Sequence, residues 1–401
     1  AERYALIDEV VERSVVESKQ TRPITDRIDQ LVLNRYFAFP FFLGVMYLMF
    51  MFTINVGSAF IDFFDIAGNA LFVDGPRTLL GQIGFPAWLR TFIADGIGGG
   101  IQLVGTFIPV IACLFLFLTF LEDTGYMARA AFVLDRLMQR LGLPGKSFVP
   151  LIVGFGCNVP AVMATRSLDN QPDRILTTIM APFMSCGARL TVYALFAAAF
   201  FPNNGQNIVF ALYFIGIAVA VVSAMVVRRH LLHSGTSTFI LELPAYHMPT
   251  LKGVLIHTWQ RLSGFVTRAG KAIVMVVVVL NVVNSVGTDG SFGNENTNDS
   301  VLSAIGRTIT PAFRPMGIDD DNWPATVGIF AGIFAKEVVV GTLDALYSQT
   351  PVGEADFNLL DEFGAAAQTI PKNLSALVST VTDPLGLDLG ELGDTTAAAD
   401  N

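Results

Sequence analysis

Two cysteines within one stretch of the sequence, residues 147–190, could bind a metal ion. Cys157 and Cys186 each lie in an apolar segment that glycine or proline interrupts. Such interruptions free backbone N–H and C=O groups that hydrocarbon cannot satisfy, so in a membrane they are tolerated where protein covers them or where they line a wet cavity. Transporters place their substrate sites at breaks of this kind. The stretch is therefore the predicted centre of function.

The chemistry of these side chains is that of a site for a soft or borderline metal. Thiolates bind Fe(II), Zn(II) and Cu(I), and exposed N–H groups near a helix break favour the thiolate form. Thioether ligands could come from three methionines close in sequence: Met163, Met180 and Met184. Cysteine is also a small apolar residue suited to tight packing. Packing is thus the competing interpretation for the pair, and the favoured one for Cys113, which lies in an unbroken run.

Ionisable residues in apolar segments form the second set of candidates. A charge at the bilayer centre costs about 2.5–3.5 kcal/mol on insertion scales, so a functional or paired role is expected. Glu337, next to Lys336, lies inside an apolar stretch and is the strongest of these candidates. Glu122 and Asp123 end an apolar span, where an interfacial position is the simpler explanation. Arg189 could pair with one of these carboxylates.

The four histidines, His230, His233, His247 and His257, fall in one polar segment. They could form a cytoplasmic metal site, although histidines on a wetted face beside a membrane are commoner. The sequence contains no GxxxxGK[ST] motif, so it predicts no phosphate loop for a nucleotide within these 401 residues.

The composition predicts a polytopic membrane protein. Hydrophobic residues make up 52% of the chain and charged residues 15%, against about 25% charged in soluble domains; the mean hydropathy is +0.55. The net charge of −9 argues against nucleic acid as a partner. The chain begins with Ala1 in a polar, periodic stretch typical of the end of a helical region, and we expect it to be cut from a longer protein.

The apolar runs predict an all-α bundle. Its N-terminus is expected to be cytoplasmic, because Arg22, Arg27 and Arg35 form a basic flank before the first run. The segment 147–165 is expected to be a re-entrant hairpin, since a full crossing would leave Arg166 and Arg174 outside. An external loop is expected up to about residue 94, an amphipathic cytoplasmic segment at 228–271 and a polar loop at 288–323. The expected spans are 37–56, 101–121, 175–201, 207–227, 272–287 and the last apolar stretch, 324–347.

The order of these segments suggests an inverted repeat. A span, a broken segment and a second span run through 101–201, and a span followed by a broken segment recurs in the opposite orientation at 272–347. Inverted repeats with matching breaks place a substrate site at the midplane between them. The partner of 175–201 is missing, so the second repeat is expected to be incomplete.

Several motifs resemble those of the ferrous iron transport protein B family, FeoB. The matching segments are LEDTGYMARAAFVLDRL (121–137), GFGCNVPAVMATR (154–166), APFMSCGARL (181–190), LELPAYHMP (241–249) and FAKEVVVGTL (334–343). The resemblance covers residues 1–347 in order. It implies a helical spacer end (1–33), a first span with an external loop (34–95), a first Gate repeat (96–205), a family-specific middle segment (206–261), an incomplete second Gate repeat (262–350) and a disordered acidic loop (351–401).

By the same resemblance the parent protein is a multi-pass Fe(II) importer of the bacterial inner membrane rather than an enzyme within this chain. Cys157 and Cys186 are then the iron ligands, and Asn158, Met184, Glu337, Glu122 and Asp123 are candidates for the transport pathway. GTP and Mg belong to an N-terminal GTPase domain of the parent. The implied partners are Fe(II), lipid, that GTPase domain, small cytoplasmic Feo accessory proteins and a second copy in a homo-oligomer.

Two other functions fit parts of the sequence. A Gate-type carrier of a nucleoside-like solute would need amide and aromatic groups at the breaks, and Asn158 is one. A membrane receptor or scaffold would use the segment 228–271 and its histidines, but it gives no reason for Glu337 and Arg189 inside apolar segments.

Overall fold

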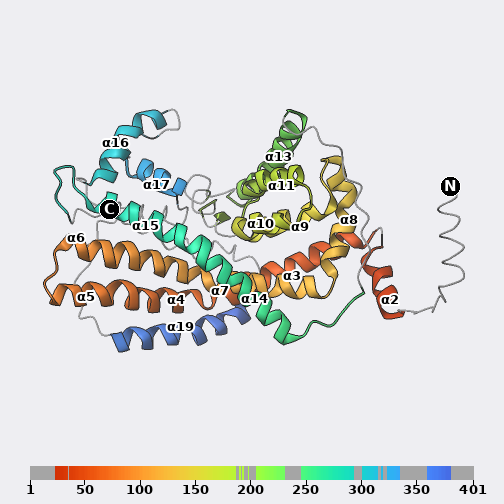
Figure 1. Ribbon diagram of the computed structural model, residues 1–401, viewed down its shortest axis with the longest axis horizontal. Coiled ribbons are helices and arrows are strands. Elements are labelled where there is room, and N and C mark those ends of the chain that lie inside the picture. The colour runs from red at the N-terminus through yellow and green to blue at the C-terminus, as the bar shows by residue number, and fades with distance from the viewer. Residues whose placement is uncertain are drawn as a thin grey trace, which may run out of the picture.

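The computed structural model describes the chain as a set of helices (Figure 1). The described residues are 23–34, 36–186, 189, 190, 192, 193, 197, 205–230, 245–292, 300–314, 318, 323–334 and 359–380. The α-helices are α2 (Pro23–Val32), α3 (Ala38–Ser58), α4 (Ile61–Gly68), α5 (Gly75–Gln82), α6 (Ala87–Arg90), α7 (Gly99–Asp123), α8 (Tyr126–Arg140), α9 (Phe148–Gly156), α10 (Asn158–Ala164), α11 (Gln171–Met180), α13 (Gly205–His230), α14 (Leu251–Phe265), α15 (Lys271–Ser285), α16 (Val301–Phe313), α17 (Trp323–Phe334) and α19 (Leu359–Thr380). Short 3-10 or π-helical turns are η1 (Asn69–Asp74), η2 (Thr91–Gly98), η3 (Gly145–Ser147), η4 (Thr165–Ser167), η5 (Ala181–Phe183) and η6 (Val266–Gly270).

Among the described residues, four continuous helical stretches are long and apolar enough to cross a membrane: Ala38–Gln82, Trp88–Asp123, Gly205–His230 and Leu251–Ser285. The protein is thus an all-α, multi-pass membrane protein, as the composition predicts. The expected span at 207–227 is confirmed as α13. The inverted relation between the two halves stays a prediction.

The prediction of an external loop up to about residue 94 is wrong, because this region is helical. Two long stretches, Ala38–Gln82 and Trp88–Asp123, run side by side as an antiparallel hairpin with its turn at 83–86 (Figure 1). The first has 45 residues, about 67 Å at 1.5 Å per residue, and so extends well beyond a hydrocarbon core of about 30 Å. Polar residues within the hairpin are paired between its helices: Gln102 Nε2 of α7 donates to Asp65 Oδ1 of α4 at 2.9 Å.

Glycines let the helices around this hairpin approach each other closely. A Cβ placed on Gly98 would lie 1.8 Å from the carbonyl oxygen of Phe72, so η2 packs directly against η1. A Cβ on Gly100 would lie 3.0 Å from the Cα of Val274, so α7 packs with similar closeness against α15. Small residues at helix interfaces are typical of membrane bundles. The glycine run at 96–100 is therefore a packing surface.

The segment 228–271 contains α14 and η6, which continue into α15 as one helical stretch, Leu251–Ser285, and its cytoplasmic position stays a prediction. Two further expectations from the sequence need correction. The predicted polar loop 288–323 contains the amphipathic helix α16. The tail expected to be disordered contains α19, which lies along α4 and also contacts α3 and η1 (Figure 1). Asn373 Nδ2 donates to Asp62 Oδ2 at 2.7 Å there, a partner 311 residues away that local sequence cannot reveal.

The glycine packing makes a matched pair of substitutions informative. Gly98→Ala should destabilise the protein by more than about 1–3 kcal/mol, because the methyl group would overlap the Phe72 carbonyl. Gly99→Ala meets open space and should be neutral or stabilising by up to about 1 kcal/mol through helix propensity. Thermal unfolding in detergent, followed by size-exclusion chromatography, measures both; equal midpoints would contradict the packing described.

Candidate metal pathway at two helix breaks

The first helix break consists of a single extended residue, Cys157, between α9 and α10. Its φ is −158° and its ψ 130°. Its N–H donates to the Val153 carbonyl at 2.9 Å, closing α9, and its carbonyl accepts from the Ala161 N–H at 3.2 Å, opening α10. Pro160 falls in the first turn of α10, where the missing N–H has no helical partner to lose. The predicted interruption of this apolar segment is confirmed at Cys157, and the re-entrant path of 147–165 stays a prediction.

The second break follows α11 and η5. Pro182 lies within η5, and Met184 turns the chain to an extended conformation with ψ 121°. The carbonyl of Cys186 then accepts from the N–H groups of Arg189 at 2.9 Å and Leu190 at 3.3 Å. Each of the two cysteines therefore precedes a turn of helix, a position where the helix dipole favours negative charge.

The two breaks pack against each other. With its side-chain amide turned so that the nitrogen faces two carbonyl oxygens, Asn158 donates to Gly154 O at 3.2 Å and to Ala181 O at 3.1 Å. A Cβ on Gly154 would lie 3.2 Å from Met184 Cβ, so the absence of a side chain there lets the second break approach α9. Asn158 and Met184 are thus both brought to the junction of the two broken segments.

The two thiols have different neighbours. Cys157 is half-buried against a cluster that includes Met49 of α3 and Leu114 of α7. Cys186 is buried, with 3% exposure. The rings of Tyr213 and Tyr193 lie 6.3 Å apart.

Hydroxyl groups gather beside Cys186. Tyr193 Oη lies 3.4 Å from Ser185 Oγ, and Ser185 is 3% exposed. The sequence did not single out Ser185, Tyr193 or Tyr213, because tyrosines in apolar helices usually pack and nothing in their spacing brings them together. Hydroxyl oxygens are hard donors and thiols are soft ones, so the segment around residues 185 and 186 holds both kinds.

Two of the candidate carboxylates, Glu122 and Asp123, pair with residues of α14. Glu122 and Asp123 end α7 and face α14: Arg261 Nη2 lies 2.5 Å from Glu122 Oε2, and His257 Nδ1 lies 3.9 Å from Asp123 Oδ1. Glu337 lies outside the described residues. Arg189, expected near a carboxylate, donates to the Pro182 carbonyl at 2.7 Å and so supports the second break.

Within the described part of the chain, no group of three or more His, Cys, Asp or Glu residues is placed to hold a metal ion. This includes the described histidines: His247 Nδ1 lies 2.7 Å from the Ala245 carbonyl, and His230 ends α13. A metal at the breaks would therefore take thiolates together with thioether, carbonyl or water ligands, a mixed set suited to a borderline ion in transit.

The role of Asn158 at the junction can be tested by replacing its amide with a carboxyl group. Asn158→Asp turns a donor into an acceptor that faces two carbonyl oxygens, and should cost about 1–3 kcal/mol. Asn207→Asp, an exposed site in the first turn of α13, should change stability little. Thermal unfolding of the two purified variants compares them, and an Asn158→Asp midpoint equal to that of the wild type would show that the amide does not join the breaks.

Two family models match the chain. The Gate model, described as "Nucleoside recognition", matches residues 104–200 and 266–385, more than half of the chain. The model for the ferrous iron transport protein B C terminus matches residues 209–261, between the two Gate matches. No solved structure matches the chain significantly.

Curated relatives named "Fe(2+) transporter FeoB" match most of the chain. The protein of Legionella pneumophila strain Lens is 53% identical over 392 residues, 96% of this chain and 52% of its own length. Those of Escherichia coli K12 and Salmonella typhimurium LT2 are 53% and 49% identical, over 83% and 92% of this chain and 43% and 48% of their own lengths. The chain spans about half the length of these relatives. It belongs to the Gate family and is a membrane region of the ferrous iron transport protein B (FeoB) family.

Proposed function

We propose that this chain is the membrane part of an importer of Fe(II), and that the ion passes the two helix breaks. The observation that carries the proposal is the pair of breaks, each with a cysteine before a helical turn, joined through Asn158 in a bundle of span-length helices. Relatives of similar sequence are named Fe(2+) transporters.

The chemistry of transport follows from ligand exchange. Hydrated Fe(II) must lose water to enter a protein path, and thiolates of Cys157 and Cys186 are donors of suitable softness to replace part of that shell. Met184 at the junction can add a thioether. Because these donors are few and mixed, the ion is held weakly enough to leave, which conduction requires.

Membership of the family suggests the location and the partners of the parent protein. We place the parent protein in the bacterial inner membrane with the N-terminus of this chain cytoplasmic, in agreement with its basic flank. A GTPase domain preceding residue 1, with GTP and Mg, would gate or drive the path through the spacer at residues 1–33. Accessory Feo proteins and a second copy are further proposed partners. Glu337 and the α7 carboxylates Glu122 and Asp123 stay secondary candidates for the path.

The two alternatives lose support from the geometry. A nucleoside-like solute would need the Asn158 amide, but that amide donates to two backbone carbonyls. A receptor or scaffold built on residues 228–271 would lose 251–270 to a helix that continues into a candidate span. Fe(II) transport therefore accounts for more of the structure than either.

The proposal predicts a loss of transport in a cysteine double variant. Anaerobic Fe(II) uptake by vesicles holding the full-length parent protein should fall about tenfold or more in Cys157→Ser/Cys186→Ser, because metal ligands are lost. Cys113→Ser, which replaces the third thiol in the unbroken helix α7, is the matched control and should retain wild-type uptake. Wild-type uptake by a folded double variant would make both cysteines packing residues.

A further inference from the structure

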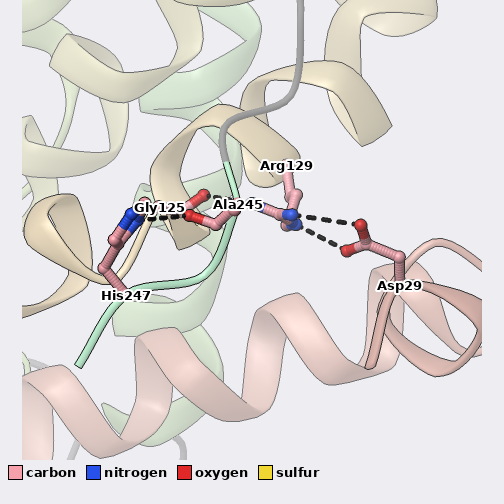
Figure 2. Close-up of polar contacts among 5 residues, drawn as sticks. All are labelled: Asp29, Gly125, Arg129, Ala245 and His247. Atoms are coloured by element: carbon pink, nitrogen blue, oxygen red, sulfur yellow. Dashed lines mark hydrogen bonds and ion pairs between the residues drawn. The ribbon is translucent and has the colours of Figure 1, made fainter. Parts of the chain in front are cut away.

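A buried arginine joins three segments of the chain that are distant in sequence. Arg129 of α8 has an exposure of 0%. Its Nε and Nη2 donate to the Asp29 carboxylate of α2 at 2.5 and 3.0 Å, and its Nη1 donates to the Gly125 carbonyl at 3.0 Å. The ring of Tyr246 covers the guanidinium group, with Cζ 3.8 Å from the ring centroid. Figure 2 shows the fork between Arg129 and Asp29 beside the strand-like segment that holds Ala245 and His247.

The contacts of Arg129 are stable only when all of its partners are present. A charge removed from water must be paired and hydrogen-bonded, and loss of one partner leaves the other uncompensated. The two-pronged geometry with Asp29 fixes orientation as well as distance, and the half-buried carboxylate, 20% exposed, has little freedom to move away. Arg129 therefore holds α2 in one place on α8.

The position of α8 is in turn connected to the first helix break. Tyr126, Ala130 and Leu134 of α8 lie in one buried cluster with Val32 of α2, and Cys157 packs against that cluster. At the other end of α8, the Asp135 carboxylate accepts from the Gly145 N–H at 2.8 Å. Gly145 begins η3, which leads directly into α9 and so to Cys157.

We propose that Arg129 is a positioning residue for transport, which couples the place of α2 to the surroundings of Cys157. Displacement of α2 would uncouple Asp29 from Arg129, loosen the shared cluster and open access to the thiol. The same joint holds Tyr246, four residues before the N-cap Thr250 of α14, so both flanks of the path respond together. The inference rests on the proposed function in treating Cys157 as part of the iron path.

The test measures thiol access and needs no iron. Purified chain in detergent is treated with a maleimide, and mass spectrometry follows modification of each of the three cysteines with time. Asp29→Asn should speed modification of Cys157 by about threefold or more, as expected for a local opening, and leave Cys113 unchanged. Asp26→Asn, an exposed site on the same helix, is the matched control and should alter neither rate.

Two further variants separate the effect of the ion pair from the effect of the tyrosine ring. Tyr246→Leu removes the ring over the guanidinium but keeps the ion pair, so it should give a smaller rise at Cys157. Asp29→Glu keeps the charge and should restore part of the protection. A rise at all three cysteines alike, or no rise at Cys157 in either Asp29→Asn or Tyr246→Leu, would overturn the proposal. These labelling outcomes do not depend on whether Cys157→Ser impairs iron uptake, so this inference and the proposed function fail separately.

Discussion

Backbone groups freed by a helix break must find partners inside the protein, because hydrocarbon offers none. The two breaks in this chain meet that requirement largely through each other. The side-chain amide of Asn158 donates to the Gly154 carbonyl in the last turn of α9 and to the Ala181 carbonyl in η5. Arg189 serves the Pro182 carbonyl. The two cysteines lie where the backbone is irregular. The hydrogen bonds that satisfy this backbone therefore also fix the positions of the two cysteines.

The helices around the breaks are arranged to permit this contact. A Cβ on Gly216 of α13 would lie 2.8 Å from the Phe183 carbonyl, and one on Gly156 would lie 3.2 Å from Leu114 Cδ1. Because these residues are glycines, α13 packs closely against η5 and α7 packs closely against the end of α9. The hydroxyl groups of Ser185 and Tyr193 lie on the side of the second break.

The sequence revealed those features whose causes are local. Glycine and proline next to each cysteine predicted the breaks, and α13 appeared as an uninterrupted apolar run. The long hairpin could not be predicted, because the apolar pieces before residue 94 are short and the partners of Asp62 and Asp65, which are Asn373 and Gln102, lie far away in the sequence. The same remote contacts explain the helical tail. The joint at Arg129 escaped prediction for a similar reason, since Asp29 lies 100 residues away.

The most direct measurement is Fe K-edge X-ray absorption of the chain loaded anaerobically with one equivalent of Fe(II). The proposed path predicts at least one sulfur ligand with an Fe–S distance of about 2.3 Å, the distance between a thiolate sulfur and the comparable divalent ion Zn(II). That shell should be lost in Cys157→Ser/Cys186→Ser and retained in Cys113→Ser. An iron environment of oxygen and nitrogen alone in the wild-type chain would contradict the account, because the breaks would then hold the thiols for packing and not for the metal.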